Sequence, residues 1–279
     1  MMKVIVTGAN GQLGREVVKT LFSERIECSC PNSKTLDITD RDNVLRFISE
    51  YKPEAVINCA GYTNVDQAET EKKQCMKVNA DGVKNLADAC SESGAKLLHI
   101  STDYVFSGEG SRPYETSDST GPLNTYGISK LKAEKIVQET MQNYFIVRTS
   151  WLIGRHGNDF VNAILKRSEL SDVVRVVDDQ IGSPTFVQDL APLLCRMIKT
   201  SRYGIYHATN EGFVSWADLA EEVFALTNKE TRVLRVSSEE YGAAAIRPKN
   251  SRLSKTSLDL AGFPRLSHWK SSLSKMLKD

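Results

Sequence analysis

The first half of the chain alternates short apolar runs with longer stretches in which apolar residues recur every three or four positions. Between the runs lie stretches with the periodicity of one helix face, such as ITDRDNVLRFISEY. Strands that alternate with helices of this length predict an α/β fold, a doubly wound parallel sheet with right-handed crossovers. The apolar runs expected to form its strands cover residues 3–8, 26–30, 55–61, 96–102 and 144–152.

After Trp151 the alternation becomes less regular, with strands expected at 173–179 and 204–210 and a helix opened by Ser215. We therefore expect a Rossmann-like NAD(P)-binding domain followed by a smaller, C-terminal substrate-binding lobe. The expected boundaries are 1–152 for the Rossmann domain, with 173–210 contributing returning strands and a helix, and 153–172 together with 211–279 for the lobe.

Composition narrows the classes of function. The 279 residues include 36 basic and 35 acidic side chains without a long basic stripe, so neither nucleic acid nor a membrane surface is an expected partner. No apolar run approaches membrane-spanning length, and the N-terminus lacks the zones of a signal peptide. The six cysteines form no CxxC and the four histidines have no metal-ligand spacing. These features predict a cytoplasmic protein with reduced thiols and no metal site.

A glycine-rich turn, TGANGQLG, directly follows the first expected strand and opens a helix. Gly8, Gly11 and Gly14 would let the backbone turn tightly and approach a pyrophosphate at the helix N-terminus. A tight strand-to-helix turn alone also uses such glycines, but this context predicts a dinucleotide site. The second strand ends at Cys30-Pro31-Asn32-Ser33 without the acidic residue that would hold an NAD ribose, which favours NADPH and leaves NADH open.

Small or polar residues at later strand ends are further candidates for cofactor contacts. Asp37 and Ile38 are placed to meet an adenine, although Asp37 is equally typical of a helix start. Ala60 and Gly61 end the next strand, where small side chains suit either a flat cofactor or close helix packing. Asn79 is interpreted as a helix-surface or supporting group.

A hydroxyl and a carboxylate, Thr102 and Asp103, end the fourth strand, and the next helix begins with YGISK. Tyr126 and Lys130 are four residues apart and therefore share one helix face. An ammonium beside a phenol lowers the phenol pKa from about 10 toward the range useful for proton transfer. Ordinary turn chemistry and a solvated helix pair are the alternatives, but the order of the motifs favours carbonyl reduction.

The motifs and their order along the chain resemble those of the extended short-chain dehydrogenase/reductase superfamily. Within it, they resemble the dTDP-4-dehydrorhamnose reductase family. The resemblance covers essentially the whole chain. It implies NAD(P)H-dependent reduction of the C4 keto group of dTDP-4-dehydro-6-deoxy-L-mannose to dTDP-L-rhamnose, a precursor of cell-surface polysaccharide. The motifs that carry it are TGANGQLG, NCAGYTNVDQAE, HISTDYVFSG, PLNTYGISK, VRTSW, DDQIGSPT, GIYHATN and RPKNSRL.

The resemblance also implies roles for individual residues. Tyr126 would protonate the C4 oxygen, Lys130 would lower the phenol pKa and hold the nicotinamide ribose, and Thr102 would bind the carbonyl oxygen. Substrate contacts are implied for Asp103 and Trp151 at the sugar and for Arg247 at the diphosphate, where a guanidinium pairs bidentately with phosphate oxygens. Cofactor contacts are implied for Gly11, Gln12, Leu13, Asp37, Ile38, Gly61, Tyr62 and Thr63.

Departures from the pattern refine the expectation. Related dehydratases carry an acidic residue where this chain has Tyr104, so simple reduction is expected instead of dehydration. In some family members, glutamates bind a magnesium ion that bridges two subunits of a dimer. Glu16 matches one of these glutamates, but Gln188 stands where another would be. No metal is therefore predicted, and a homodimer stays open. The alternatives are a reductase of another nucleotide-4-keto-sugar and a non-catalytic regulatory subunit that binds NADP.

Overall fold

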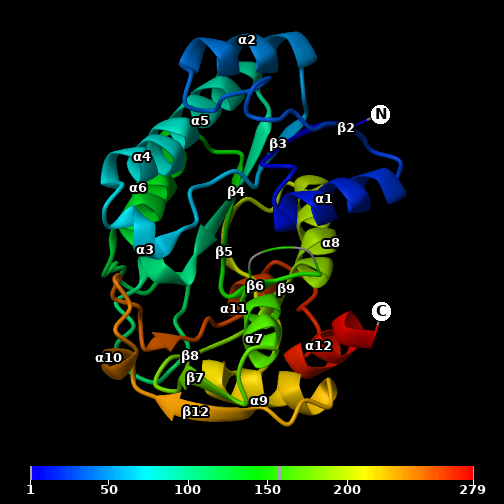
Figure 1. The fold of residues 1–279 in the computed structure, drawn as a ribbon. Helices are drawn as coiled ribbons and strands as arrows, with labels where there is room; N and C mark the ends of the chain where they lie inside the picture. Colours follow the sequence, from blue (N-terminus) through cyan, green and yellow to red (C-terminus); the bar gives the residue numbers. More distant parts are fainter. Residues whose placement is uncertain (1, 156, 158, 279) are drawn as a thin grey trace.

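The computed structural model describes residues 2–155, 157 and 159–278, and its larger part is built on a six-stranded parallel sheet (Figure 1). The strand order is β10-β5-β4-β3-β1-β2, so the winding changes direction between β1 and β3. Ligands of such sheets bind beyond the carboxyl ends of the strands at this switch point. The strands are β1 Lys3–Thr7, β2 Glu27–Ser29, β3 Ala55–Asn58, β4 Lys96–Thr102, β5 Tyr144–Thr149 and β10 Gly204–His207.

Helices cover both faces of this sheet, because alternate strand residues are apolar on opposite sides. Val4 and Val6 pack against α1 and α8, whereas Ile5, between them, packs in the core beneath α2, α5 and α6. This arrangement confirms the predicted doubly wound α/β fold. The covering helices are α1 Gln12–Ser23 and α8 Val187–Ile198 on one face, and α2 Arg41–Tyr51, α5 Gly82–Ser93 and α6 Thr125–Thr140 on the other.

The stretch after β3 is divided into α3 Val65–Ala68, α4 Lys72–Met76 and a π-helical turn, Lys77–Asp81, before α5. The π turn carries Asn79, which is 1% exposed. Its side chain accepts a hydrogen bond from the Tyr62 backbone N–H at 2.7 Å. Widened helical turns of this kind are common at functional sites.

The rest of the chain forms a smaller part around three short sheets (Figure 1). Of residues 173–210, β10 joins the large sheet and α8 packs against it, whereas β7 Val173–Val177 pairs with β12 Arg232–Val236. The exact domain boundaries stay a prediction. The remaining elements are β6 Leu152–Ile153, α7 Phe160–Ser168, β8 Ile181–Gly182, β9 Thr185–Phe186, β11 Val214–Ser215, α9 Trp216–Leu226, α10 Ser238–Tyr241, β13 Asn250–Ser251, α11 Thr256–Leu260 and α12 Trp269–Lys278.

The strand expected over 144–152 ends three residues early. Trp151 has a φ of 48°, a left-handed conformation that a residue with a large side chain seldom adopts. The chain turns there and continues in β6. Within the part of the chain that the structure describes, no helix is long and apolar enough to cross a membrane.

Candidate active site

The glycine turn between β1 and α1 is shaped by close backbone contacts. Gly8 has a φ of 66°, and a Cβ atom there would lie 2.5 Å from the Ala60 nitrogen. A Cβ at Gly14 would lie 2.2 Å from the Gly8 carbonyl oxygen. Gly11 precedes α1 and supplies no side-chain cap to its first N–H groups. A turn with this geometry fits a pyrophosphate, which the N–H groups and the helix dipole would stabilise.

The two residues after Gly11 have different surroundings. The Gln12 amide donates a hydrogen bond to Asp159 at 3.1 Å, and its side chain packs against Gly154. The Leu13 side chain is buried in the core, so only its backbone is available to a ligand. The glycine turn is thereby tied to the loop that precedes α7.

Asp37 and Ile38 follow the second strand. Asp37 is exposed, and its carboxylate accepts hydrogen bonds from the backbone and hydroxyl of Thr39. The helix start belongs to Asp40, whose side chain caps α2. The Ile38 side chain is buried beneath Gly82 and reaches the surface with 6% of its area. A contact to an adenine would therefore come mainly from Asp37 and the neighbouring backbone.

The loop after β3 presents the residues expected along the cofactor. Ala60 and Tyr62 are half-buried, and Gly61 and Thr63 are exposed. Asn79 holds this loop by bonding both the N–H and the carbonyl of Tyr62, and it also donates to Ser129 of α6 at 2.9 Å. Asn79 thus connects the loop after β3 to the helix that carries Tyr126. It is a buried supporting residue and does not lie on a helix surface.

Thr102 and Asp103 lie buried at the carboxyl end of β4. The Thr102 hydroxyl donates to the Asp103 carboxylate at 2.9 Å, and the other carboxylate oxygen, Oδ2, is buried without a hydrogen-bond partner. Burial raises the pKa of Asp103 to about 6, although hydrogen bonds from Ser251 and Thr102 oppose the shift. An unpartnered buried carboxylate oxygen is costly and is typical of a site that meets a ligand.

Tyr126 is held beside this pair by the start of α6. Asn124 caps the helix by accepting from the Gly127 N–H at 2.8 Å, and a Cβ at Gly127 would lie 2.3 Å from the Tyr104 carbonyl oxygen. The Tyr126 and Tyr104 rings meet edge to face at 5.9 Å. Helix α6 therefore packs tightly on the turn after β4, which brings the Tyr126 phenol to the Thr102 hydroxyl.

The pKa of the Tyr126 phenol differs from the expectation. Burial and the Asp103 carboxylate raise it, and the hydrogen bond with Thr102 only partly opposes them. The sequence predicts a lowered phenol pKa, but the Lys130 amine points into the protein, where it donates to the Ile100 carbonyl at 2.5 Å. A raised pKa keeps the phenol protonated at neutral pH, as a proton donor must be.

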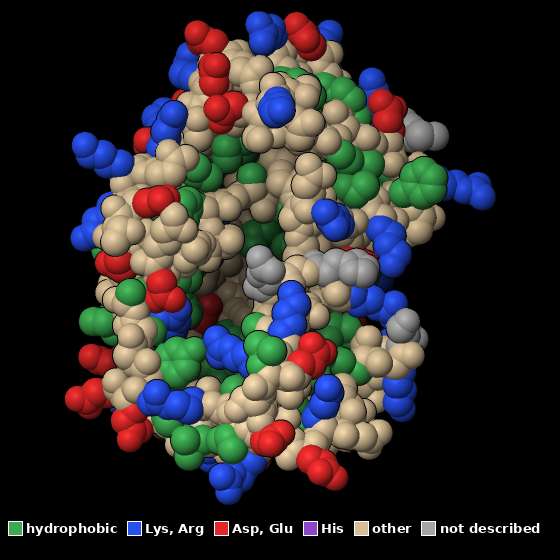
Figure 2. All heavy atoms as spheres, viewed as in Figure 1, with side chains coloured by type: hydrophobic (Ala, Val, Ile, Leu, Met, Phe, Trp, Pro, Cys, Tyr) green, Lys and Arg blue, Asp and Glu red, His purple; other side chains and the backbone are tan. Residues whose placement is uncertain are grey.

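A cavity of about 580 Å³ extends from Tyr104 into the smaller part of the molecule. Figure 2 shows the surface hollowed between the two parts. The lining of the cavity combines aromatic rings with polar and basic side chains. This combination suits a ligand in which a sugar is joined to an anionic group. The lining includes Asp66, Tyr104, Arg167, Arg175, Gln180, Trp216, Arg247 and Lys249.

Trp151 stands behind the cavity wall. Its ring stacks on Trp216 at 3.5 Å with 13° between the planes, and Trp216 lines the cavity. The Trp216 indole donates to Gln180 at 3.2 Å. The left-handed backbone at Trp151 stores strain at this position, a feature that accumulates at ligand sites.

Arg247 lines the cavity and is already paired with an acidic side chain. Its guanidinium donates two hydrogen bonds to Asp66, at 3.0 and 2.7 Å, and these lower the pKa of the Asp66 carboxyl. The Asn124 amide donates to the neighbouring Ile246 carbonyl at 2.8 Å. The loop of Arg247 is thereby fastened to the start of the helix that carries Tyr126.

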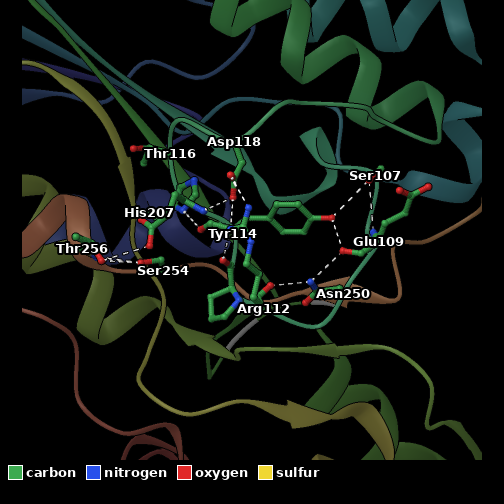
Figure 3. A network of polar contacts seen from close by, with 12 residues as sticks. Ser107, Glu109, Arg112, Tyr114, Thr116, Asp118, His207, Asn250, Ser254 and Thr256 are labelled. Carbon is green, nitrogen blue, oxygen red and sulfur yellow. Dashed lines mark hydrogen bonds and ion pairs between the residues drawn. The ribbon is translucent and has the colours of Figure 1, made fainter.

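A network of hydrogen bonds around Tyr114 holds the segment that follows Arg247 (Figure 3). The Tyr114 N–H donates to the Arg252 carbonyl, and the Ser254 N–H donates to the Tyr114 carbonyl, each at 2.8 Å. The Tyr114 phenol donates to the Glu109 carbonyl, and the Asn250 amide donates to the Arg112 carbonyl at 2.9 Å. The loop after β4 and the segment after Arg247 therefore form one unit.

Several cavity residues escape sequence reasoning. Trp216 follows Ser215, which the sequence identifies only as a helix cap, and Arg175 is an exposed position of an alternating strand. Asp66 lies three residues after Thr63, in a segment that the sequence assigns to cofactor contacts. The sequence feature that could have identified Trp216 as a cavity residue is its position as an aromatic side chain in the first turn of a helix. Among the described residues, no group of three or more His, Cys, Asp or Glu is arranged to hold a metal ion.

Comparison with known proteins gives a consistent family. Residues 2–279 match the model of the RmlD substrate binding domain. The chain is 39% identical to the spore coat polysaccharide biosynthesis protein SpsK of Bacillus subtilis, covering 100% of this chain and 98% of that protein. It is 41% identical to a dTDP-4-dehydrorhamnose reductase of Streptomyces griseus, covering 97% and 91%. A dTDP-4-dehydrorhamnose reductase of Bacillus anthracis, solved in complex with NADP, is 43% identical with a TM-score of 0.97, covering 100% and 99%.

Proposed function

Because the chain belongs to the family of the RmlD substrate binding domain, we propose that it is a dTDP-4-dehydrorhamnose reductase. It reduces the C4 keto group of dTDP-4-dehydro-6-deoxy-L-mannose with NADPH, and the product is dTDP-L-rhamnose. Relatives with this name align over nearly the whole chain, and one of them was solved with NADP. The product enters cell-surface polysaccharide, in line with the name of the spore coat relative.

The observation that carries the proposal is the position of Tyr126. Its ring packs on Tyr104, two residues beyond Thr102, at the carboxyl end of β4, in the crevice where doubly wound sheets bind nucleotides. The glycine turn that fits a pyrophosphate lies on the same sheet edge, after β1. Across the crevice, the cavity beyond Tyr104 holds the polar and aromatic groups that suit a nucleotide-sugar.

The reaction uses these residues in defined roles. The Thr102 and Tyr126 hydroxyls donate hydrogen bonds to the C4 carbonyl oxygen and polarise the carbonyl. When bound, the reduced nicotinamide supplies the hydride to C4. Tyr126 transfers its phenolic proton to the oxygen, which becomes the C4 hydroxyl of the product. We assign to Lys130, one helical turn further along α6, the ammonium that favours the phenolate after the transfer, although its amine here contacts the Ile100 carbonyl.

We assign the cofactor contacts to the two strand-end loops. The backbone of Gly11 to Leu13 receives the pyrophosphate, and the loop from Ala60 to Thr63 lies along the middle of the cofactor. Asp37 faces the adenosine. The absence of a carboxylate at residues 30–33 removes a repulsion against a 2′-phosphate, which supports NADPH over NADH.

We assign the substrate contacts to the other side of the crevice. The Asp103 oxygen without a partner receives a sugar hydroxyl. Trp216, backed by the stacked ring of Trp151, forms the aromatic wall for the sugar, and Arg247 pairs with the diphosphate. We further propose a cytoplasmic enzyme, which six free thiols support, and a homodimer as its assembly.

The direct test combines the protein with the dTDP-4-keto sugar and each reduced nicotinamide, while absorbance at the reduced-cofactor band is followed. Oxidation of NADPH that depends on the sugar supports the proposal. Binding of NADPH without turnover of any nucleotide-4-keto-sugar would instead favour a non-catalytic regulatory subunit. Turnover of a different keto sugar at a higher kcat/KM would reassign the substrate and keep the mechanism.

A further inference from the structure

The ion pair between Asp66 and Arg247 joins the two parts of the molecule. Asp66 is the second residue of α3, three residues after Thr63 of the loop assigned to the cofactor. Arg247 lies between α10 and β13 in the smaller part, and both residues line the cavity. Their side chains are 44% and 22% exposed. An ion pair this exposed contributes little to stability, so holding the fold together does not account for it.

The pair uses only one side of the Arg247 guanidinium. Nη1 and Nη2 donate to the two carboxylate oxygens of Asp66, and Nη1 also donates to the Ala245 carbonyl at 3.1 Å. A guanidinium has five N–H groups in one plane, so the N–H of Nε and the second N–H of Nη2 are left, side by side along one edge. Within the described part of the chain, Nε makes no hydrogen bond and Nη2 makes no second one. This edge is therefore available as a bidentate donor to a phosphate.

Asp66 is itself held in place from two directions. Its Oδ1 accepts from the Ala245 N–H at 3.0 Å, so the carboxylate binds the segment of Arg247 at two points. At the other end of α3, the Glu69 carboxylate accepts from the Thr125 N–H at 2.7 Å, at the start of α6. The hydrogen bond from Arg247 lowers the pKa of the Asp66 carboxyl, which therefore stays ionised at neutral pH. The carboxylate thus has a fixed place between α6 and the smaller part.

We propose that Asp66 is a positioning residue that turns the unused edge of the Arg247 guanidinium toward the diphosphate of the nucleotide-sugar. The inference rests on the proposed function, which assigns the diphosphate to Arg247. Asp66 binds the tip of the guanidinium, so a long side chain with many rotamers is already ordered before the ligand arrives. A site that is ordered in advance loses less conformational entropy on binding, which raises its affinity. In this role Asp66 acts through Arg247 and does not contact the ligand.

Charge alone predicts the opposite effect of Asp66. A carboxylate near the diphosphate repels it, and a carboxylate bound to Arg247 competes with it for the guanidinium. Removal of the Asp66 charge would then tighten the binding of the nucleotide. Orientation predicts weaker binding instead, because the guanidinium loses its fixed direction. The sign of the change in affinity therefore distinguishes orientation from repulsion and competition.

The test uses dTDP, which carries the diphosphate but has no keto group to reduce, titrated calorimetrically into the protein saturated with NADP⁺. Asp66→Asn keeps the size of the side chain but replaces one acceptor oxygen by an NH₂, which cannot accept from Arg247. We expect the dissociation constant for dTDP to rise about threefold to tenfold. An unchanged or lower dissociation constant would overturn the proposal.

The matched control is Glu239→Gln, which removes one negative charge from an exposed residue of the same cavity wall and leaves the pair of Asp66 and Arg247 intact. Its dissociation constant for dTDP should stay the same or fall. The affinity of Asp66→Asn for NADPH should also stay near that of the wild type. A parallel loss of NADPH affinity would overturn the proposal, because it would show that Asp66 only holds the cofactor loop.

Arg247→Ala separates this inference from the proposed function. Loss of dTDP affinity in Arg247→Ala without loss in Asp66→Asn would overturn only the role of Asp66. An unchanged affinity in Arg247→Ala would overturn the diphosphate assignment and the role of Asp66 with it. In the Arg247→Ala background, Asp66→Asn should cause no further loss, since no guanidinium is left to orient. A further loss as large as in the wild-type background would contradict an effect that acts through Arg247.

Discussion

Asp103→Asn is expected to remove a pH-dependent loss of stability that the active site imposes on the fold. Burial raises the pKa of Asp103 from 3.8 to about 6, and the residue is 3% exposed. The folded protein therefore binds this proton more tightly than the unfolded chain does. The contribution of Asp103 to the free energy of unfolding is therefore most favourable below pH 4, and it falls as the pH rises toward 6.

The size of the effect follows from the shift. A shift of about two pH units corresponds to about 3 kcal/mol, because each unit is worth about 1.4 kcal/mol. The asparagine variant cannot ionise, so its free energy of unfolding relative to the wild type should increase by this amount between pH 4 and pH 7. The buried, unpartnered Oδ2 explains why the ionised wild type bears the cost.

The assay is urea unfolding followed by circular dichroism at several pH values from 4 to 8, for the wild type and Asp103→Asn. Asp81→Asn, a change at an exposed helix position, is the matched control and should leave the pH dependence of the wild type unchanged. A constant difference between the wild type and Asp103→Asn across this range would refute a buried, destabilised carboxylate.

Three further changes test separate parts of the site. Arg247→Ala should raise the KM for the nucleotide-sugar about tenfold or more with little change in kcat, because a charge-assisted contact is lost; an unchanged KM would remove Arg247 from the diphosphate site. Gly14→Ala should abolish NADPH binding or folding, since its Cβ would meet the Gly8 oxygen at 2.2 Å, whereas Gly121→Ala, with 3.5 Å to its nearest neighbour, should be tolerated. Trp216→Ala should weaken substrate binding and leave NADPH affinity intact; parallel losses of both would indicate collapse of the lobe.

Local patterns made the nucleotide side of the molecule predictable. The glycine turn, the strand ends and Tyr126 each lie within a few residues of a strand or helix signal, and regular crossovers place them on one sheet edge. Resemblance to a family supplied Trp151 and Arg247, which no local pattern marks. The π-helical turn before α5 carries no local signal, because Asn79 bonds to Tyr62, a partner 17 residues away.

The environment of each ionisable group was less predictable, since it depends on contacts between distant segments. The spacing of Tyr126 and Lys130 correctly puts both on α6, but it does not reveal that His99 and Ile100 of β4 hold the amine. Burial then shifts the phenol pKa upward, opposite to the expected direction. Trp216 and Asp66 were likewise missed, because they join the cavity only when the smaller lobe folds back on the sheet.

The most direct measurement of the central claim is single-turnover reduction by Tyr126→Phe with saturating NADPH and dTDP-4-keto sugar. Loss of the proton donor should slow the chemical step by ~10²–10⁴-fold, while the dissociation constant for NADPH stays near that of the wild type. A rate within a few-fold of the wild type would contradict proton transfer from Tyr126, whatever the overall stability of the variant.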